Sequence, residues 1–277
     1  KVILSAWGVG AVNIERFGIN NQRVYRITAG DGQMYTLKPY KANHQAEREG
    51  ALLHYLAKAG APVPGVMRTN AGSFAAHDEQ CHYMLYPFLQ GETITEFFDA
   101  DALVNAYIFG RGLARLHIAM VSIPQREDLP LMDLRDLILD YTRRTLLPKY
   151  AELADVYAVL DAELAPVYPE LPVQIIHRDS HPGNMLVHDG EVIGYLDFEI
   201  SVRGPRIFDV AYATTAILSE IKGVDNTRRS QWQGIMTSLV KGYHAINPLL
   251  PVELDRLWHI QVCIQLLFVA YFQQPEH

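Results

Sequence analysis

Three oxygen-bearing side chains stand close together in the sequence, at Asp179, Asn184 and Asp197. An amide oxygen beside a carboxylate suits a hard cation such as Mg²⁺, which takes oxygen ligands. Asn184 and Asp197 therefore form a candidate metal site. A second carboxylate, Asp179, can accept a proton from a hydroxyl group or align it. The stretch predicts a base and a metal site on one short scaffold.

A β-hairpin is the element that must position these groups. Met185 to Val187 is typical of a strand, Val192 to Leu196 of the returning strand, and His188-Asp189-Gly190 of the turn between them. Asp-Gly readily takes the positive φ that a tight hairpin turn needs. Asn184 and Asp197 then lie at the open end of the hairpin, side by side. The loop that precedes the hairpin holds the carboxylate of Asp179 over the same end.

Three motifs in this stretch carry a resemblance to a known group of enzymes. The order His-x-Asp-x-x-x-x-Asn over 177–184, followed by Asp-Phe, resembles the catalytic loop and metal-binding Asp of protein kinases. The His-Pro-Gly-Asn ending, Leu-Asp-Phe-Glu at 196–199 and Gly-Pro-Arg-Ile-Phe-Asp at 204–209 resemble the aminoglycoside phosphotransferase and choline kinase group. Within that group the chain is most similar to the homoserine kinase type II and spore-coat-kinase-like branch.

This resemblance implies an α+β, bilobal protein-kinase-like fold. A small lobe with an antiparallel sheet and one helix is expected over 1–86, a linker over 87–91, and a larger, mainly helical lobe over 92–277. The implied activity is transfer of the γ-phosphoryl group of ATP to a hydroxyl of a small molecule, with ATP and Mg²⁺ as cofactors. Asn184 and Asp197 are the implied metal ligands, and Asp179 is the implied catalytic residue.

Lys38 ends a predicted strand and is expected to pair with a carboxylate on the next helix, predicted over 43–59. Glu49 falls on the apolar stripe of that helix, which is formed by Leu52, Leu53 and Leu56. An inward-facing Glu needs a cation, and Lys38 is the nearest candidate. Glu47 falls toward the flank and is the second choice. In the resemblance, the Lys–Glu pair holds the lysine against the α- and β-phosphates of the nucleotide.

The other expected nucleotide contacts come from two connections in the first lobe. Gly18 to Gln22, with Asn20 and Asn21, takes the place of the loop that covers the ATP phosphates, although it matches neither a Gly-rich nor a Walker pattern. A plain hairpin turn is the alternative interpretation. Tyr86 and Phe88 bracket the linker whose backbone hydrogen-bonds adenine in the related kinases. Its alternative is a simple strand-to-helix turn.

Periodicity and turn residues predict the remaining elements. An antiparallel meander is expected from strands over 9–16, 24–28 and 34–38, and a further strand over 82–86. Residues 65–75 are expected to form strand and turn. Helices are expected over 101–120, 134–149, 150–167, 210–218, 231–245 and 251–272.

Several basic side chains flank the predicted catalytic loop. Arg203 and Arg206 either clamp an anionic substrate group, such as a carboxylate, or are structural. Arg178 is a departure from most of the small-molecule family, which carries a small residue there, so its role is open. His177 is expected to brace the loop rather than act as a base. His181 lies inside the loop and is a candidate phosphate contact.

Two further polar residues are expected to be structural. Asp209 precedes an apolar helix, so it is expected to cap the helix N-terminus, and in the family the matching Asp braces the catalytic loop. The two roles are compatible. His117, at the end of the helix predicted over 101–120, is expected to be a core or capping histidine rather than a metal ligand.

Composition narrows the partners and the setting. The net charge of −7 and the lack of a long basic run argue against a nucleic-acid partner. Cys81 and Cys263 have no Cys-x-x-Cys neighbour, so neither a disulfide framework nor a zinc site is expected, which favours the cytoplasm. No apolar run reaches the ~18 residues of a membrane span, and no signal peptide is evident. The chain begins at Lys1, so missing N-terminal residues are expected, and Glu276-His277 is read as the start of a tag.

Two rival functions stay open at this stage. The first is a nucleotide-binding scaffold without turnover, although Lys38, Asp179, Asn184 and Asp197 are all retained. The second is a protein-directed kinase, which the absence of an Ala-Pro-Glu segment after Asp197 disfavours. Among small acceptors, homoserine-like amino alcohols, choline-like amines, sugars and aminoglycosides remain possible, because a fold does not name its substrate. The expected partner is a small hydroxyl acceptor, with neither nucleic acid nor membrane.

Overall fold

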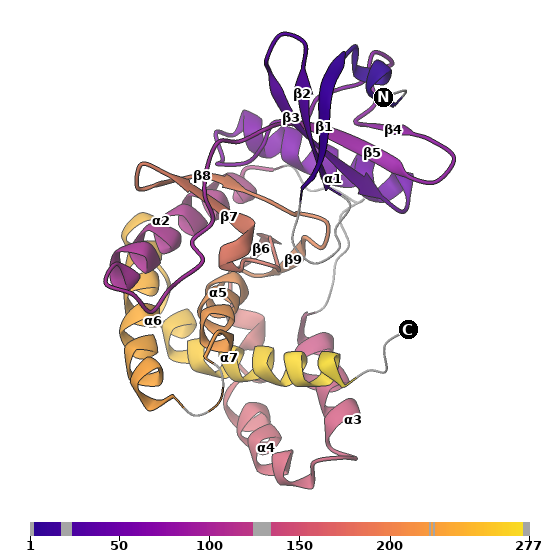
Figure 1. Cartoon of the computed structure of the whole chain (residues 1–277). Coiled ribbons are helices and arrows are strands. Elements are labelled where there is room, and N and C mark those ends of the chain that lie inside the picture. The colour runs from indigo at the N-terminus through magenta and orange to yellow at the C-terminus, as the bar shows by residue number, and fades with distance from the viewer. Residues whose placement is uncertain (1–2, 18–23, 124–133, 222, 224, 274–277) are drawn as a thin grey trace. The chain divides into compact units, whose positions relative to one another are not determined.

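The computed structural model describes residues 3–17, 24–123, 134–221, 223 and 225–273, which form two compact units (Figure 1). The first unit contains the described parts of Lys1–Glu92 and Ser122–Asp128 together with Leu186–Glu199. The second contains Thr93–Val121, Ile200–His277 and Leu129–Met185, again in their described parts. The boundaries at residues 86 and 91 stay a prediction.

The first unit is built on an antiparallel five-stranded sheet in the order β1-β2-β3-β5-β4. Its strands are β1 (Ala11–Phe17), β2 (Val24–Ala29), β3 (Met34–Tyr40), β4 (Ala75–His77) and β5 (His82–Pro87). The first unit also contains a 3₁₀ helix (Ile3–Trp7), the helix α1 (Asn43–Lys58) and the hairpin of β7 (Met185–His188) with β8 (Glu191–Tyr195). Over residues 65–75 the predicted turn is confirmed at 70–71, whereas the predicted strand is present only at Ala75, where β4 begins.

Alternation along β3 sends its side chains to opposite faces of the sheet. Tyr35 and Leu37 pack with Leu4, Trp7 and Ile27 in an apolar cluster. Lys38 and Tyr40 point to the other face, together with Met84, which pairs with Lys38 on β5. Helix α1 packs on this second face, since a Cβ on Gly50 would lie 3.1 Å from Met84 Sδ. Lys38 therefore faces α1, while the apolar cluster fills the opposite side.

The hairpin of β7 and β8 has the turn that the sequence predicts. Asp189 and Gly190 have φ values of 48° and 74°, as the two central residues of a tight hairpin turn require. Backbone bonds hold the hairpin to the first unit: Glu92 and Val187 exchange both N–H···O bonds, at 3.0 and 2.9 Å. This attachment places the Asp197 segment in the same unit as Lys38.

The second unit is mainly helical, so the predicted α+β fold class is confirmed. Strands β6 (Val173–Ile176) and β9 (Val202–Pro205) pair antiparallel. The α-helices are α2 (Ala102–Val121), α3 (Thr142–Leu146), α4 (Ala154–Glu163), α5 (Ile207–Ser219), α6 (Asn226–Ile246) and α7 (Pro251–Phe272). A π-helical segment, Asp136–Tyr141, leads into α3, so the helix predicted over 134–149 is not a single α-helix.

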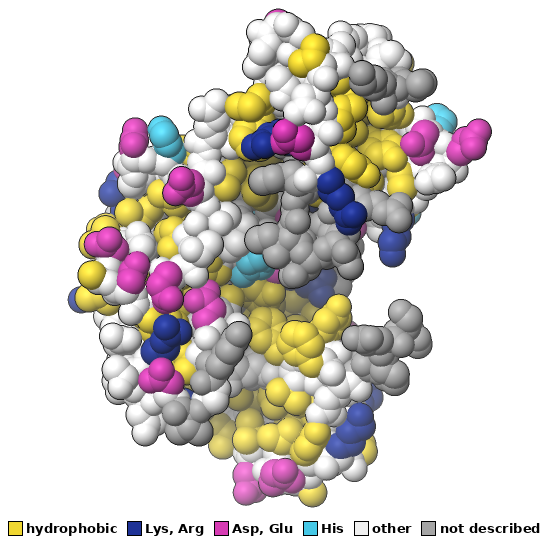
Figure 2. Space-filling view, viewed as in Figure 1, with side chains coloured by type: hydrophobic (Ala, Val, Ile, Leu, Met, Phe, Trp, Pro, Cys, Tyr) yellow, Lys and Arg dark blue, Asp and Glu magenta, His cyan; other side chains and the backbone are white. Residues whose placement is uncertain are grey.

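Figure 2 shows apolar side chains over the region of α7, whose exposed residues include Leu254, Trp258 and Val269. No described helix is long and apolar enough to cross a membrane.

Helices α2 and α6 lie side by side because glycines let their backbones approach (Figure 1). A Cβ on Gly110 of α2 would lie 1.9 Å from the carbonyl oxygen of Leu239, and one on Gly242 of α6 would lie 2.2 Å from that of Tyr107. Neither backbone can yield as a flexible side chain would, so this crossing requires glycine at both positions.

Gly110→Ala is therefore expected to lower the free energy of unfolding by about 2–3 kcal/mol through overpacking. Gly234→Ala on α6 is the matched control, since its added Cβ would meet only Leu103 Cδ2, at 3.5 Å. That substitution should raise stability by about 0.5–1 kcal/mol, because Ala favours a helix interior over Gly. Urea unfolding followed by circular dichroism measures both. Equal changes in the two variants would contradict the close crossing.

Candidate active site

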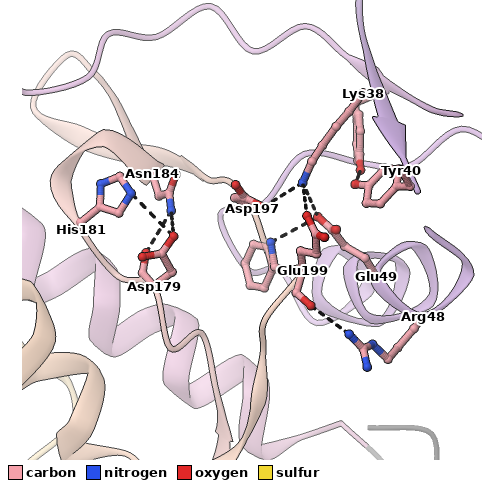
Figure 3. Close-up of polar contacts among 11 residues, drawn as sticks. Lys38, Tyr40, Arg48, Glu49, Asp179, His181, Asn184, Asp197 and Glu199 are labelled. Carbon is pink, nitrogen blue, oxygen red and sulfur yellow. Dashed lines mark hydrogen bonds and ion pairs between the residues drawn. The ribbon is translucent and has the colours of Figure 1, made fainter. Parts of the chain in front are cut away.

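In the first unit Lys38 lies among three carboxylates (Figure 3). Its Nζ lies 2.8 Å from Asp197 Oδ1, 3.6 Å from Glu49 Oε1 and 3.9 Å from Glu199 Oε2. The Glu49 side chain is only 3% exposed, so it depends on the lysine for charge compensation. The structure thus has the Lys38–Glu49 pair expected from the apolar stripe of α1. Glu47, the second choice, instead accepts hydrogen bonds from the backbone of Phe74 and Ala75.

The protonation of this cluster follows from burial and charge. Burial on its own would lower the pKa of Lys38, but the Glu49 and Asp197 carboxylates outweigh it and raise that pKa. Lys38 is therefore a firmly charged ammonium at neutral pH. Burial also raises the pKa of Glu49, and the lysine offsets part of that rise. Because one lysine faces three carboxylates, the cluster favours cations near Asp197.

The segment after β8 is held in an unusual backbone conformation. Asp197 has a φ of 64°, in the left-handed region that residues with a side chain seldom occupy. The next residue, Phe198, donates its backbone N–H to Glu49 Oε1 at 3.2 Å. Arg48 on α1 donates to the backbone carbonyl of Glu199 at 2.9 Å. Two adjacent residues of α1 therefore hold the backbone that follows Asp197, and strain of this kind is concentrated at functional positions.

The structure describes only some of the residues of the first unit that are predicted to contact the nucleotide. The Tyr86 hydroxyl is buried and lies 2.6 Å from that of Tyr40, and the backbone N–H of Phe88 donates to Met34 at 3.0 Å. Both groups are engaged within the sheet, and their contact with a nucleotide stays a prediction. Asn20 and Asn21 lie outside the described residues.

In the second unit the Asp179 carboxylate receives a donor on each oxygen. Asn184 Nδ2 donates to Oδ2 at 3.0 Å, and the Tyr212 hydroxyl donates to Oδ1 at 2.8 Å. His181 Nε2 lies 3.7 Å from Oδ2. The Asp179 side chain remains 25% exposed. Its orientation is thus fixed while part of it stays open to a ligand.

Asn184 is oriented by the same contacts. Its Nδ2 also donates to the backbone carbonyl of Asp179, at 3.0 Å. Since both bonds use the amide nitrogen, the amide oxygen is the atom left for a cation. Asn184 immediately precedes β7, and Asp197 follows β8 by two residues. The prediction that this oxygen and the Asp197 carboxylate together bind Mg²⁺ stays a prediction.

The loop that carries Asp179 is braced by a buried carboxylate. Asp209 accepts the backbone N–H groups of His177 and Arg178 at 2.7 and 2.8 Å. It also lies 2.9 Å from His117 Nε2, and His117 Nδ1 lies 2.8 Å from the Tyr243 hydroxyl. Asp209 and His117 are fully buried. His117 is therefore a core histidine that helps to hold the brace.

One predicted role of Asp209 is wrong. Helix α5 begins at Ile207, so Asp209 lies inside its first turn rather than before it, and its carboxylate serves the loop instead of capping the helix. His177 Nδ1 accepts the backbone N–H of Asp179 at 3.2 Å, a second brace within the loop. Sequence reasoning missed Tyr212, whose only signal is its position on α5 three residues after Asp209.

The two arginines predicted to clamp an anion differ in the structure. Arg206 donates through Nε and Nη2 to Glu253, at 2.9 and 2.7 Å, and through Nη1 to Asn247 at 2.7 Å. Glu253 is fully buried, so Arg206 is engaged as its counterion and is structural. Arg203 lies on β9 opposite Ile175, and its side chain has no partner among the described residues.

Comparisons with known proteins agree with the motifs. The model of the phosphotransferase enzyme family matches residues 14–246. A homoserine kinase of Phenylobacterium zucineum is 33% identical over 150 residues, covering 52% of this chain and 43% of that protein. A homoserine kinase of Bartonella tribocorum is 26% identical over 212 residues, covering 74% and 62%. The chain thus spans less than two thirds of the length of these relatives.

Two solved structures show the same fold. The amicoumacin kinase hAmiN, in complex with AMP-PNP, Ca²⁺ and Ami, aligns over 98% of this chain and 84% of its own, with a TM-score of 0.77 and 16% identity. A microcompartment-associated aminopropanol kinase aligns over 100% and 89%, with a TM-score of 0.77 and 19% identity. The kinase-like fold implied by the motifs is therefore confirmed.

Asp209→Asn tests the brace. The substitution replaces a buried charged acceptor of two N–H groups, so it should lower the free energy of unfolding by about 3 kcal/mol. Asp225→Asn is the matched control, because Asp225 also accepts a backbone N–H, from Arg228 at 3.0 Å, but at the exposed N-terminus of α6. Asn caps helices as well as Asp, so a change below about 0.5 kcal/mol is expected. Similar losses in urea unfolding would contradict a special role for Asp209.

Proposed function

The chain belongs to the phosphotransferase enzyme family, and we propose that it transfers the γ-phosphoryl group of ATP to a hydroxyl of a small molecule. The observation that carries this proposal is the pairing of Lys38 with Asp197 and Glu49, which presents a fixed cation for phosphate oxygens next to a carboxylate for a metal. AMP-PNP and Ca²⁺ in the complex of hAmiN support the use of a nucleotide and a divalent cation.

The residues of the first unit would bind the nucleotide. Lys38, held by Glu49, would contact the α- and β-phosphates. The linker over 87–91 would contact adenine, and Asn20 and Asn21 would cover the phosphates. Asn184 and Asp197 would hold Mg²⁺, which neutralises charge on the phosphate oxygens when bound. We place the lobe boundaries at residues 86 and 91.

Asp179 would meet the acceptor. Its carboxylate would accept the hydroxyl proton or align the hydroxyl for attack on the γ-phosphorus. The hydrogen bonds from Tyr212 and Asn184 hold it in one orientation, which matters because phosphoryl transfer depends mainly on positioning and charge stabilisation. The acceptor we favour is a small amino alcohol, since the matched relatives are homoserine kinases and one structural neighbour is an aminopropanol kinase.

The rival functions make different predictions. A nucleotide-binding scaffold would bind ATP without transfer, and a protein-directed kinase would phosphorylate peptides rather than amino alcohols. The likeness to small-molecule kinases supports the proposal over both. We also propose that the enzyme acts in the cytoplasm, where free thiols such as those of Cys81 and Cys263 persist.

Asp179→Asn and Asp197→Asn should separate chemistry from binding. Asp179→Asn is expected to lower kcat at least ~100-fold, because the hydroxyl loses its base, while Mg-ATP affinity stays within about twofold. Asp197→Asn should in addition weaken nucleotide binding in Mg²⁺, with little change in EDTA. ADP release with a panel of amino alcohols and nucleotide titration calorimetry measure the two effects. Equal loss of both properties in both variants would contradict this division of roles.

Tyr212→Phe tests the orientation of Asp179. The ring packing against Phe208 and Phe268 can be kept, while the hydroxyl donor is lost. We expect kcat to fall about 10-fold, with KM for ATP unchanged, since a hydrogen bond to a carboxylate contributes about 1.5–3 kcal/mol. Tyr157→Phe is the control, because its buried hydroxyl donates to Thr142 at 3.1 Å and it should alter kcat less than about twofold. An unchanged kcat in Tyr212→Phe would remove the tyrosine from the account.

A further inference from the structure

A hydrogen-bond network in the second unit extends the brace on the catalytic loop toward the end of α6. From Asp209 it passes through His117 to the Tyr243 hydroxyl, over distances of 2.9 and 2.8 Å. Asn247, which immediately follows α6, lies 3.3 Å from that hydroxyl through Nδ2 and 2.7 Å from Arg206 Nη1 through Oδ1. The first three residues are fully buried. Because an unpaired polar group is costly at such depth, each member depends on its neighbour.

The direction of these hydrogen bonds follows from which atoms can donate. A guanidinium can only donate, so the Asn247 atom that Arg206 contacts must be the amide oxygen. The amide nitrogen therefore faces Tyr243 and donates to the hydroxyl oxygen. Burial raises the pKa of Tyr243, so the hydroxyl keeps its own proton at neutral pH. That proton remains for the next member of the network.

The Tyr243 hydroxyl thereby decides the tautomer of His117. Its proton points at Nδ1 of the histidine, so Nδ1 accepts and the ring carries its proton on Nε2. This N–H meets the carboxylate of Asp209. The opposite tautomer would set a nitrogen lone pair against a buried carboxylate and remove one of its donors.

We propose that Tyr243 and Asn247 are positioning residues for the phosphoryl transfer, acting through His117. They hold the ring as the Nε2–H tautomer, which keeps the carboxylate of Asp209 paired. That carboxylate in turn fixes the loop that carries Asp179 by accepting two of its backbone N–H groups. The inference rests on the proposed function and adds two residues of the helical unit to it. Because the reaction depends on positioning, a change at the end of α6 should reach the reacting centre.

Nitrogen-15 NMR of the assigned His117 ring reads the tautomer without any substrate. In the wild type we expect a proton on Nε2 alone. Asn247→Asp keeps an acceptor for Arg206 but has no donor for Tyr243. The tyrosine hydroxyl should then turn to the new carboxylate, so that the histidine carries protons on both nitrogens. Asn226→Asp, at the exposed start of the same helix, is the matched control and should leave the ring unchanged.

Tyr243→Phe tests the link to catalysis. It keeps the ring, whose centroid lies 5.5 Å from that of His117, and removes the hydroxyl donor. We expect kcat to fall about 10-fold and the backbone amides of His177 and Arg178 to exchange hydrogen about 10-fold faster. KM for ATP should change less than about twofold. Tyr157→Phe, which removes another buried hydroxyl, is the control and should change each value less than about twofold.

Several results would overturn the proposal. One is a wild-type ring with a proton on Nδ1, which decides the tautomer even if a variant fails to fold. Others are unchanged ring protonation in Asn247→Asp, or a kcat in Tyr243→Phe no lower than in Tyr157→Phe. Equal losses of kcat and Mg-ATP affinity would show general loosening instead. Ring protonation and amide exchange that behave as expected, without ADP release from any acceptor, would sustain the network while the proposed phosphoryl transfer fails.

Discussion

The buried carboxylate of Asp209 is the constraint on which the candidate site depends. A fully buried anion must find its donors inside the protein, and here they are the backbone N–H groups of His177 and Arg178 and the ring of His117. Satisfying that charge fixes the loop conformation, including the left-handed backbone of Arg178. Asp179 is the next residue after Arg178. The direction of its carboxylate therefore follows from the contact that Asp209 on α5 makes with the loop.

The first unit uses the same principle around a cation. Glu49 is almost fully buried and Lys38 compensates it, which holds the ammonium between α1 and the segment after β8. Asp197, like Arg178, keeps a left-handed backbone that only the surrounding contacts can maintain. At Asp197 this strain coincides with a residue proposed to hold the metal, whereas the apolar cluster around Leu37 and the glycine crossing of α2 and α6 supply stability elsewhere.

Features set by local pattern could be predicted from the sequence. The Asp189-Gly190 turn follows from the φ preferences of its two residues, and the choice of Glu49 over Glu47 follows from helical periodicity. The family motifs extended this to the fold class. In each case the deciding information lies within a few neighbouring residues.

Features set by distant contacts were misread or missed. Asp209 was expected to cap a helix, but the helix begins two residues earlier and the carboxylate reaches a loop more than 30 residues away. Arg206 was a candidate for binding an anionic substrate group, but in the structure it pairs with Glu253 on α7. Tyr212 carries no motif of its own, and only the packing of α5 brings its hydroxyl to Asp179. These pairings depend on which elements meet, which periodicity does not reveal.

Phosphorus NMR of a reaction with ATP, Mg²⁺ and a small hydroxyl acceptor tests the central claim most directly. The account predicts a new phosphomonoester resonance that grows in step with ADP and is absent when the acceptor is omitted. Nucleotide bound in the presence of Mg²⁺, with no phosphomonoester from any amino alcohol, hydroxy acid, sugar or aminoglycoside, would contradict it and leave a binding scaffold.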